Sequence, residues 1–147
     1  MADTHALSTA VTSGAPQADA ALSVESGRHG RLLVARLRPN EDLIEGLEAL
    51  CRQHGVRRAV LRGALGSLID ATLAGADGRL STVDGPGVEV LSLNGEIVGE
   101  AAHGTPSQLY GMVAGTDGRV HAGHLVRGAN LAFITIEASL QEWLPQA

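Results

Sequence analysis

The 147-residue sequence is 44% hydrophobic but only 2% aromatic, so its core must be built from Leu, Val, Ile and Ala. Its length suits one domain with a self-sufficient core, and its net charge of −5 excludes a general attraction to nucleic acid or anionic membranes. The single cysteine, Cys51, excludes an intramolecular disulfide. With no visible secretory signal and no apolar run of membrane length, the sequence indicates a cytoplasmic protein without a membrane partner.

Residues 1–27 are rich in Ala, Ser, Thr and Gly and show no hydrophobic periodicity. Such a segment can bury little apolar surface, so we expect a flexible N-terminal arm. Residues 28–147 then form the single domain.

The first regular elements are a strand and a helix. Leu33, Ala35 and Leu37 alternate with polar residues between residues 31 and 38, which predicts a strand. Asn40 is then expected to cap the start of a helix, and Gly55 is expected to follow its end. The apolar stripe of this helix repeats at helical spacing and consists of Leu43, Ile44, Leu47, Leu50 and Cys51. Cys51 is therefore interpreted as a core residue rather than a nucleophile.

The rest of the sequence predicts strands joined by short turns. We expect strands at 57–61 and 68–74, separated by a turn at 63–67 that could also cradle an anion through its backbone N–H groups. A long strand follows at 88–98, where the apolar pattern changes phase between Val90 and Leu91 and indicates a bulge or two-sided burial.

A hairpin and a last strand close the chain. Two apolar runs flank Gly115-Thr116-Asp117-Gly118, a pattern typical of a β-hairpin. The strand at 131–138 is apolar on both faces, with Ile134 expected on the same face as Ile136, which indicates cover by the core or by another subunit. The whole pattern predicts an α+β fold: a mostly antiparallel sheet of about seven strands with one main helix.

Four segments together resemble the PPC (plants and prokaryotes conserved) domain family. They are LRPNEDLIEGL at 37–47, GALGSL at 63–68, EVLSLNGEI at 89–97, and the ending formed by 118–125 followed by 134–140. The resemblance covers roughly residues 31–140, and it rests on the order and spacing of these segments.

The resemblance implies an antiparallel sheet with flanking helices, a homotrimer, and a role as a DNA-binding or regulatory interaction module. In the plant members, an AT-hook with an Arg-Gly-Arg-Pro core contacts DNA. The nearest match here, Arg28-His29-Gly30-Arg31, is not followed by proline. We therefore expect the stand-alone bacterial type without an AT-hook, whose partner is a copy of itself and whose contact with DNA, if any, is weak.

The resemblance also places a pocket beside His124. Some bacterial members carry a His-x-His whose positions here are Gln108 and Tyr110, and these are poor zinc ligands. Zinc would therefore need His103, His121 and His124, although the last two are an odd number of residues apart and should point to opposite faces of a strand. We assign no catalytic residue and no cofactor.

Two alternative functions stay open. One is a metal-dependent lyase or hydrolase with its metal near His124. The other is a small-ligand pocket between subunits that is lined by Gln108, Tyr110, His124 and Glu137. In the metal-free reading, His124 is partly buried and bonds to backbone or to Glu137.

Overall fold

The computed structural model describes residues 24–100 and 105–147, and in these residues it forms one sheet and one helix. The predicted N-terminal arm falls almost wholly outside the described residues, so its boundary stays a prediction. The elements are β1 (Gly27–Leu37), α1 (Leu43–Gln53), β2 (Arg58–Leu68), β3 (Ala71–Ala74), β4 (Leu80–Val83), β5 (Val88–Val98), β6 (Gln108–Ala114), β7 (Val120–Leu125) and β8 (Ala132–Pro145).

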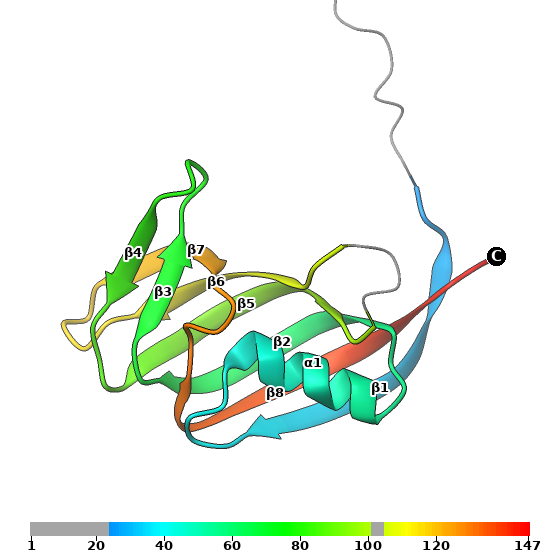
Figure 1. The fold of residues 1–147 in the computed structure, drawn as a ribbon, viewed down its shortest axis with the longest axis horizontal. Helices are drawn as coiled ribbons and strands as arrows, with labels where there is room; N and C mark the ends of the chain where they lie inside the picture. The colour runs from blue at the N-terminus through cyan, green and yellow to red at the C-terminus, as the bar shows by residue number, and fades with distance from the viewer. Residues whose placement is uncertain (1–23, 101–104) are drawn as a thin grey trace, which may run out of the picture.

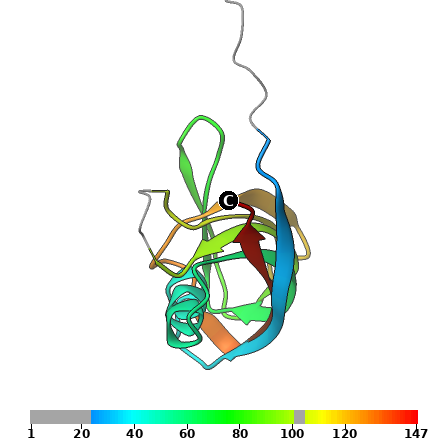
Figure 2. The same ribbon diagram turned by 90° about the vertical axis from the view of Figure 1, so that its right-hand side faces the viewer.

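All strands belong to an eight-stranded sheet with the order β1-β8-β2-β5-β6-β7-β3-β4 (Figure 1). Every strand pair is antiparallel, which confirms the predicted α+β class. The strand missing from the sequence prediction is β4, a four-residue edge strand that pairs only with β3. The side view shows the sheet curling around the side that carries α1 (Figure 2).

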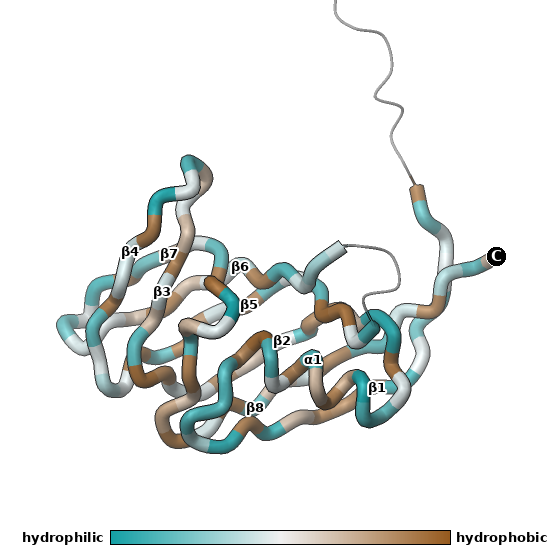
Figure 3. Tube along the Cα trace, viewed as in Figure 1, coloured by the Kyte–Doolittle hydropathy of each residue, from teal (hydrophilic) through white to brown (hydrophobic). Residues whose placement is uncertain are grey.

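The helix α1 packs against the inner face of the sheet, the face that also carries the core. Its expected stripe is confirmed, because Leu43, Ile44, Leu47 and Cys51 are all at most 2% exposed. Apolar residues recur along the neighbouring strands β1, β2 and β8 (Figure 3). The resemblance implied more than one flanking helix, but the described residues contain only α1.

The start of α1 differs from the expectation in one residue. The N-cap is Asp42, whose carboxylate accepts hydrogen bonds from the N–H groups of Ile44 and Glu45 at 3.1 and 3.0 Å. Asn40 instead has a φ of 69° and donates its N–H to the carbonyl of Ala132. Both residues are good caps by type, so only the path of the preceding turn selects Asp42; such a cap contributes about 1 kcal/mol. Gly55, with a φ of 64°, follows the C-cap His54 as predicted.

The predicted turn at 63–67 is wrong, because these residues lie inside the continuous strand β2. Their register with β8 shifts between Leu61 and Gly63, so a bulge in β2 takes the place of a turn. Gly66, with a φ of 133°, lies so close to the backbone of Thr135 and Ile136 that a side chain would collide with it. Close strand approach, rather than a turn or an anion cradle, explains this glycine.

Irregularities in β5 and β8 decide which apolar side chains leave the core. The predicted bulge in β5 is confirmed by a register shift between Val90 and Ser92, and Leu91 is 51% exposed there. The prediction for Ile134 is wrong: it is 62% exposed, whereas Ile136 is fully buried. The β2–β8 register shifts between these positions, so β8 carries extra residues that break the alternation.

The outer face of the sheet, opposite the core, keeps several apolar side chains in solvent. We call the following exposed residues on the adjacent strands β8, β2, β5, β6 and β7 the outer apolar cluster: Leu65, Leu91, Met112, Val120, Phe133 and Ile134. Exposed apolar side chains that gather on one face are typical of a surface that contacts another molecule. Among the described residues, no helix is long and apolar enough to cross a membrane.

Candidate functional site

Three of the four predicted pocket residues come together on the outer face of the sheet. Tyr110 of β6 is paired with His124 of β7, and Gln108 lies two residues before Tyr110 on the same face. The rings of Tyr110 and His124 are 5.1 Å apart between centroids and meet edge to face at 79°. All three residues line one pocket of about 310 Å³.

Glu137, the fourth predicted residue, is not part of this pocket. It lies on β8, where it is paired in register with Arg36 of β1 and Leu65 of β2. Its carboxylate forms an ion pair with Arg36. Two strands, β2 and β5, separate β8 from β6 in the sheet, so Glu137 could approach the pocket only from another copy of the chain.

The pocket also contains residues that the sequence did not single out. On β5, Asn94 is paired with Tyr110 and Glu96 is paired with Gln108. Thr105 and Pro106, which precede β6, complete the rim with Gly95. The alternation of β5 could have placed Asn94 and Glu96 on one face, but the register that sets them opposite β6 is a tertiary property.

One lining residue of the pocket, Glu96, is held by an ion pair with Arg58. Arg58 donates from Nε and one terminal nitrogen to both oxygens of Glu96, each at 2.9 Å. The other terminal nitrogen of Arg58 reaches Glu25 at 2.6 Å. The hydrogen bonds that Arg58 donates to Glu96 and Glu25 raise the pKa of its guanidinium, so this group stays charged and committed to its two partners.

The histidines do not come together as a metal site would require. His124 is exposed and points to the outer face, whereas His121 is half-buried and lies on the inner-face side of β7. This confirms that the two imidazoles point in opposite directions. His103 lies outside the described residues. The described residues contain no group of three His, Cys, Asp or Glu side chains arranged to hold a metal ion.

The residues at the expected ligand positions do not fit a zinc site either. An amide oxygen and a phenol occupy positions 108 and 110, and neither is a good zinc ligand. His124 contacts the ring of Tyr110, whereas a metal ligand usually has its other ring nitrogen oriented by a carboxylate or a carbonyl. The sequence expectation is that His124 is partly buried and bonds to backbone or to Glu137. His124 is instead exposed, and Glu137, which lies on β8 with two strands between it and β6, is paired with Arg36.

The sheet order, the one helix within residues 24–100 and 105–147, and the outer-face pocket define an α+β protein with an antiparallel sheet, and comparisons with known proteins agree. The family model named Plants and Prokaryotes Conserved (PCC) domain, the family also abbreviated PPC, matches residues 24–144. The chain therefore belongs to the PCC domain family.

Curated relatives with a longer chain also match. The bifunctional proteins GlmU of two Synechococcus strains are 33% and 34% identical over 114 and 107 residues. The matched segment covers 78% and 73% of this chain but only 17% and 16% of those relatives. The chain therefore spans about a sixth of their length.

Solved structures share the fold. A hypothetical protein from Salmonella enterica has a TM-score of 0.69 and 27% identity, with 80% of each chain covered. A plant- and prokaryote-conserved (PPC) protein from Pyrococcus horikoshii has a TM-score of 0.69 and 20% identity, with 85% of this chain and 87% of that chain covered. Two further neighbours, from Bacteroides thetaiotaomicron and Ralstonia eutropha, are described as putative DNA-binding proteins and are 15% and 20% identical, with TM-scores of 0.61 and 0.60.

Proposed function

We propose that this protein is a self-associating PCC domain, a homotrimer that acts as an interaction module. The observation that carries this proposal is the outer apolar cluster. Its six members lie on five adjacent strands and keep between 36% and 63% of their surface in solvent. A second copy of the chain that covers this face would bury them, and each fully buried side chain of this size is worth about 1.5–3 kcal/mol.

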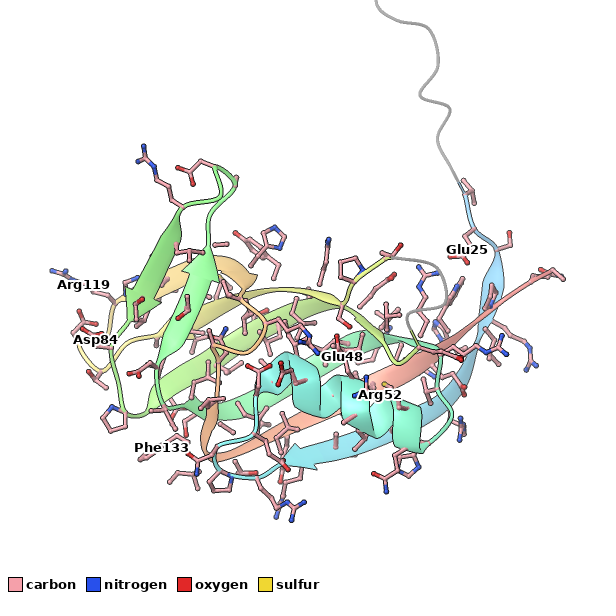
Figure 4. All side chains as sticks on the ribbon, viewed as in Figure 1. Glu25, Glu48, Arg52, Asp84, Arg119 and Phe133 are labelled. Carbon is pink, nitrogen blue, oxygen red and sulfur yellow. The ribbon has the colours of Figure 1, made fainter. Side chains whose placement is uncertain are left out.

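The number of copies rests on the family resemblance, whereas the surface itself supports self-association. Phe133 projects outward at the start of β8 (Figure 4). Ile134 beside it is 62% exposed, and both stand at the β8 irregularity that takes them out of the core. A charge placed at either position would have to be buried without a partner on assembly, which is strongly unfavourable.

Native mass spectrometry of the purified protein tests this proposal. We expect three chains for the wild type and monomers for Phe133→Asp and Ile134→Asp, with an unchanged circular dichroism spectrum. Val24→Asp is the matched control, because Val24 is 83% exposed and lies outside every strand. A wild-type monomer, or trimers that persist in both cluster variants, would contradict the proposal.

The interaction partner could include DNA, as the names of two structural neighbours suggest for those proteins. If this chain binds DNA, we expect the binding to be weak. Eight of its eleven arginines are already in ion pairs within the described residues, and the sequence contains no lysine. Only Arg28, Arg52 and Arg62 have no such partner there.

A salt titration of DNA binding checks this expectation. With so few uncommitted cations, only a few phosphates can be neutralised by each chain, so we expect binding weaker than about 1 µM that disappears as salt rises toward physiological strength. Tight binding at high salt would contradict this expectation, because it would require a DNA-recognition surface other than the few arginines without ion pairs. The substitution Arg62→Gln, compared with Arg38→Gln in an existing ion pair, would locate the contact.

A further inference from the structure

The pocket on the outer face is built as two rows of side chains that cross adjacent strands. In the first row, Asn94, Tyr110 and His124 lie opposite one another on β5, β6 and β7. In the second row, Glu96 lies opposite Gln108. Side chains in such register on one face lie about 5 Å apart across the strands. The pocket floor therefore presents one phenol ring, one imidazole and two carboxamides within a small area.

The polar groups of the floor are not used by the fold itself. Among the described residues, the two carboxamides, the Tyr110 hydroxyl and the His124 imidazole make no side-chain hydrogen bond to the protein. Glu96 is the exception, because both of its oxygens are held by Arg58. The remaining donors and acceptors are therefore available to a ligand, because no hydrogen bond within the described protein has to be broken to bind it.

The charges around the pocket disfavour an anion. Arg58 is shared by two carboxylates, Glu96 and Glu25, so this group of three carries a net charge of −1 when all are ionised. Among the described residues, no arginine lines the pocket itself, and Arg58 contacts it only through Glu96. A phosphate or carboxylate placed there would find no guanidinium free to neutralise its charge. A neutral ring does not need such a partner.

We propose that this pocket binds an uncharged purine base of the adenine type, as the free base or the nucleoside. A carboxamide can donate to and accept from the adenine edge at once, which is how Asn and Gln recognise this base. The ring of Tyr110, 47% exposed, offers a surface on which a planar base can stack. The volume of about 310 Å³ is at the small end of ligand pockets and fits a base with little beyond its sugar.

This site borders the outer apolar cluster on the same face of the sheet, because Tyr110 of the pocket and Met112 of the cluster are two residues apart on β6. The pocket is formed by β5, β6 and β7 of one chain, at the ends near Thr105 and Pro106. Met112 and Val120 of the outer apolar cluster lie toward the opposite ends of β6 and β7, beside the hairpin turn. Binding and assembly are distinguished by their own measurements, a titration with ligand for the first and native mass spectrometry for the second.

Isothermal titration of the full-length protein with adenosine tests the proposal. We expect adenosine to bind saturably. AMP and uridine should each bind about tenfold more weakly than adenosine. Asn94→Ala and Gln108→Ala should each weaken adenosine binding about tenfold, the loss expected from one bidentate contact. Gln53→Ala is the matched control, because Gln53 is an exposed carboxamide at the end of α1, outside the pocket.

Three results would overturn the proposal. One is no heat of binding for any nucleoside up to millimolar concentration, with native mass spectrometry showing an intact assembly. Another is tighter binding of AMP than of adenosine with a steep salt dependence, which would mean that the site recognises phosphate. The third is unchanged affinity in Tyr110→Ala and Asn94→Ala when their melting temperatures match the wild type.

Discussion

At the scale of single residues, the cysteine illustrates how packing controls chemistry. Cys51 is completely buried on the inner face of α1. Burial raises the pKa of its thiol to about 11, because the thiolate would be desolvated. The reactive thiolate is therefore scarce at neutral pH, and no reagent can reach the sulfur without opening the core.

We predict that this thiol is unreactive in the folded protein. Ellman's reagent at pH 8 should modify less than about a tenth of Cys51 over an hour and should modify all of it in urea above the unfolding transition. Absorbance of the released thionitrobenzoate measures both amounts. Rapid stoichiometric reaction of the folded protein would show that the end of α1 opens locally.

Asn130 shows a different use of a buried residue. It is 1% exposed, and its side chain joins Thr72 of β3 to the carbonyl of Val126 in the loop before β8. Its backbone N–H donates to Asp42, the cap of α1, at 3.0 Å. One residue thus links the far part of the sheet to the start of the helix. No sequence pattern distinguishes it from an ordinary loop asparagine.

At the scale of elements, an ion-pair cluster fixes the loop before β8 against α1. Arg127 donates to Glu45 at 2.9 Å and to Glu48 at 2.9 and 3.3 Å. Glu48 is carried by α1 (Figure 4). Burial tends to raise the pKa of Glu48, but hydrogen bonds from Arg127 and Ser107, together with the positive charge of Arg127, outweigh this effect and lower the pKa from 4.5. The pKa of Glu142 is likewise lowered by the hydrogen bonds that it accepts from Arg31.

These lowered pKa values predict a loss of stability in acid. A carboxylate with a lower pKa in the folded state stabilises the protein fully above its unfolded pKa, and this contribution disappears as the pH falls through the folded value. We expect the urea midpoint to fall between about pH 5 and about pH 3, and to fall less steeply in Glu48→Gln. Glu41→Gln, just before α1, serves as the control, because the ion pair of Glu41 with Arg38 is more exposed to solvent than that of Glu48. Identical pH slopes in all three proteins would contradict the role of Glu48.

At the scale of the whole molecule, the two faces of the sheet have different tasks. The inner face forms one continuous core with α1, which a chain of this size can complete alone. The outer face holds the apolar cluster beside the polar pocket. If the cluster is buried between copies, stability must depend on protein concentration, because only the folded state can assemble.

We predict that the melting temperature of the wild type rises by a few degrees for each tenfold increase in concentration. Phe133→Asp should melt at a temperature that is independent of concentration. Differential scanning fluorimetry over a hundredfold range of concentration measures both. A wild-type melting temperature that does not change with concentration would count against assembly through this face.

The sequence by itself determined the elements whose signals are local. The stripe of α1, the hairpin around Asp117-Gly118 and the bulge near Leu91 follow from side-chain periodicity and turn chemistry, and the structure confirms all three. The order of the family segments also predicted the family. Local patterns suffice here because each depends on residues within a few positions of one another.

The tertiary structure alone decided what lies next to what. The short strand β4, the continuation of β2 through 63–67 and the exposure of Ile134 all depend on register with distant strands. The candidate pocket depends on the same register, which sets Asn94 beside Tyr110 and places Glu137 two strands away. Strand pairing is a contact between segments that are far apart in the chain, and a bulge changes which way the side chains beyond it point. No local sequence pattern could therefore determine the register of these strands.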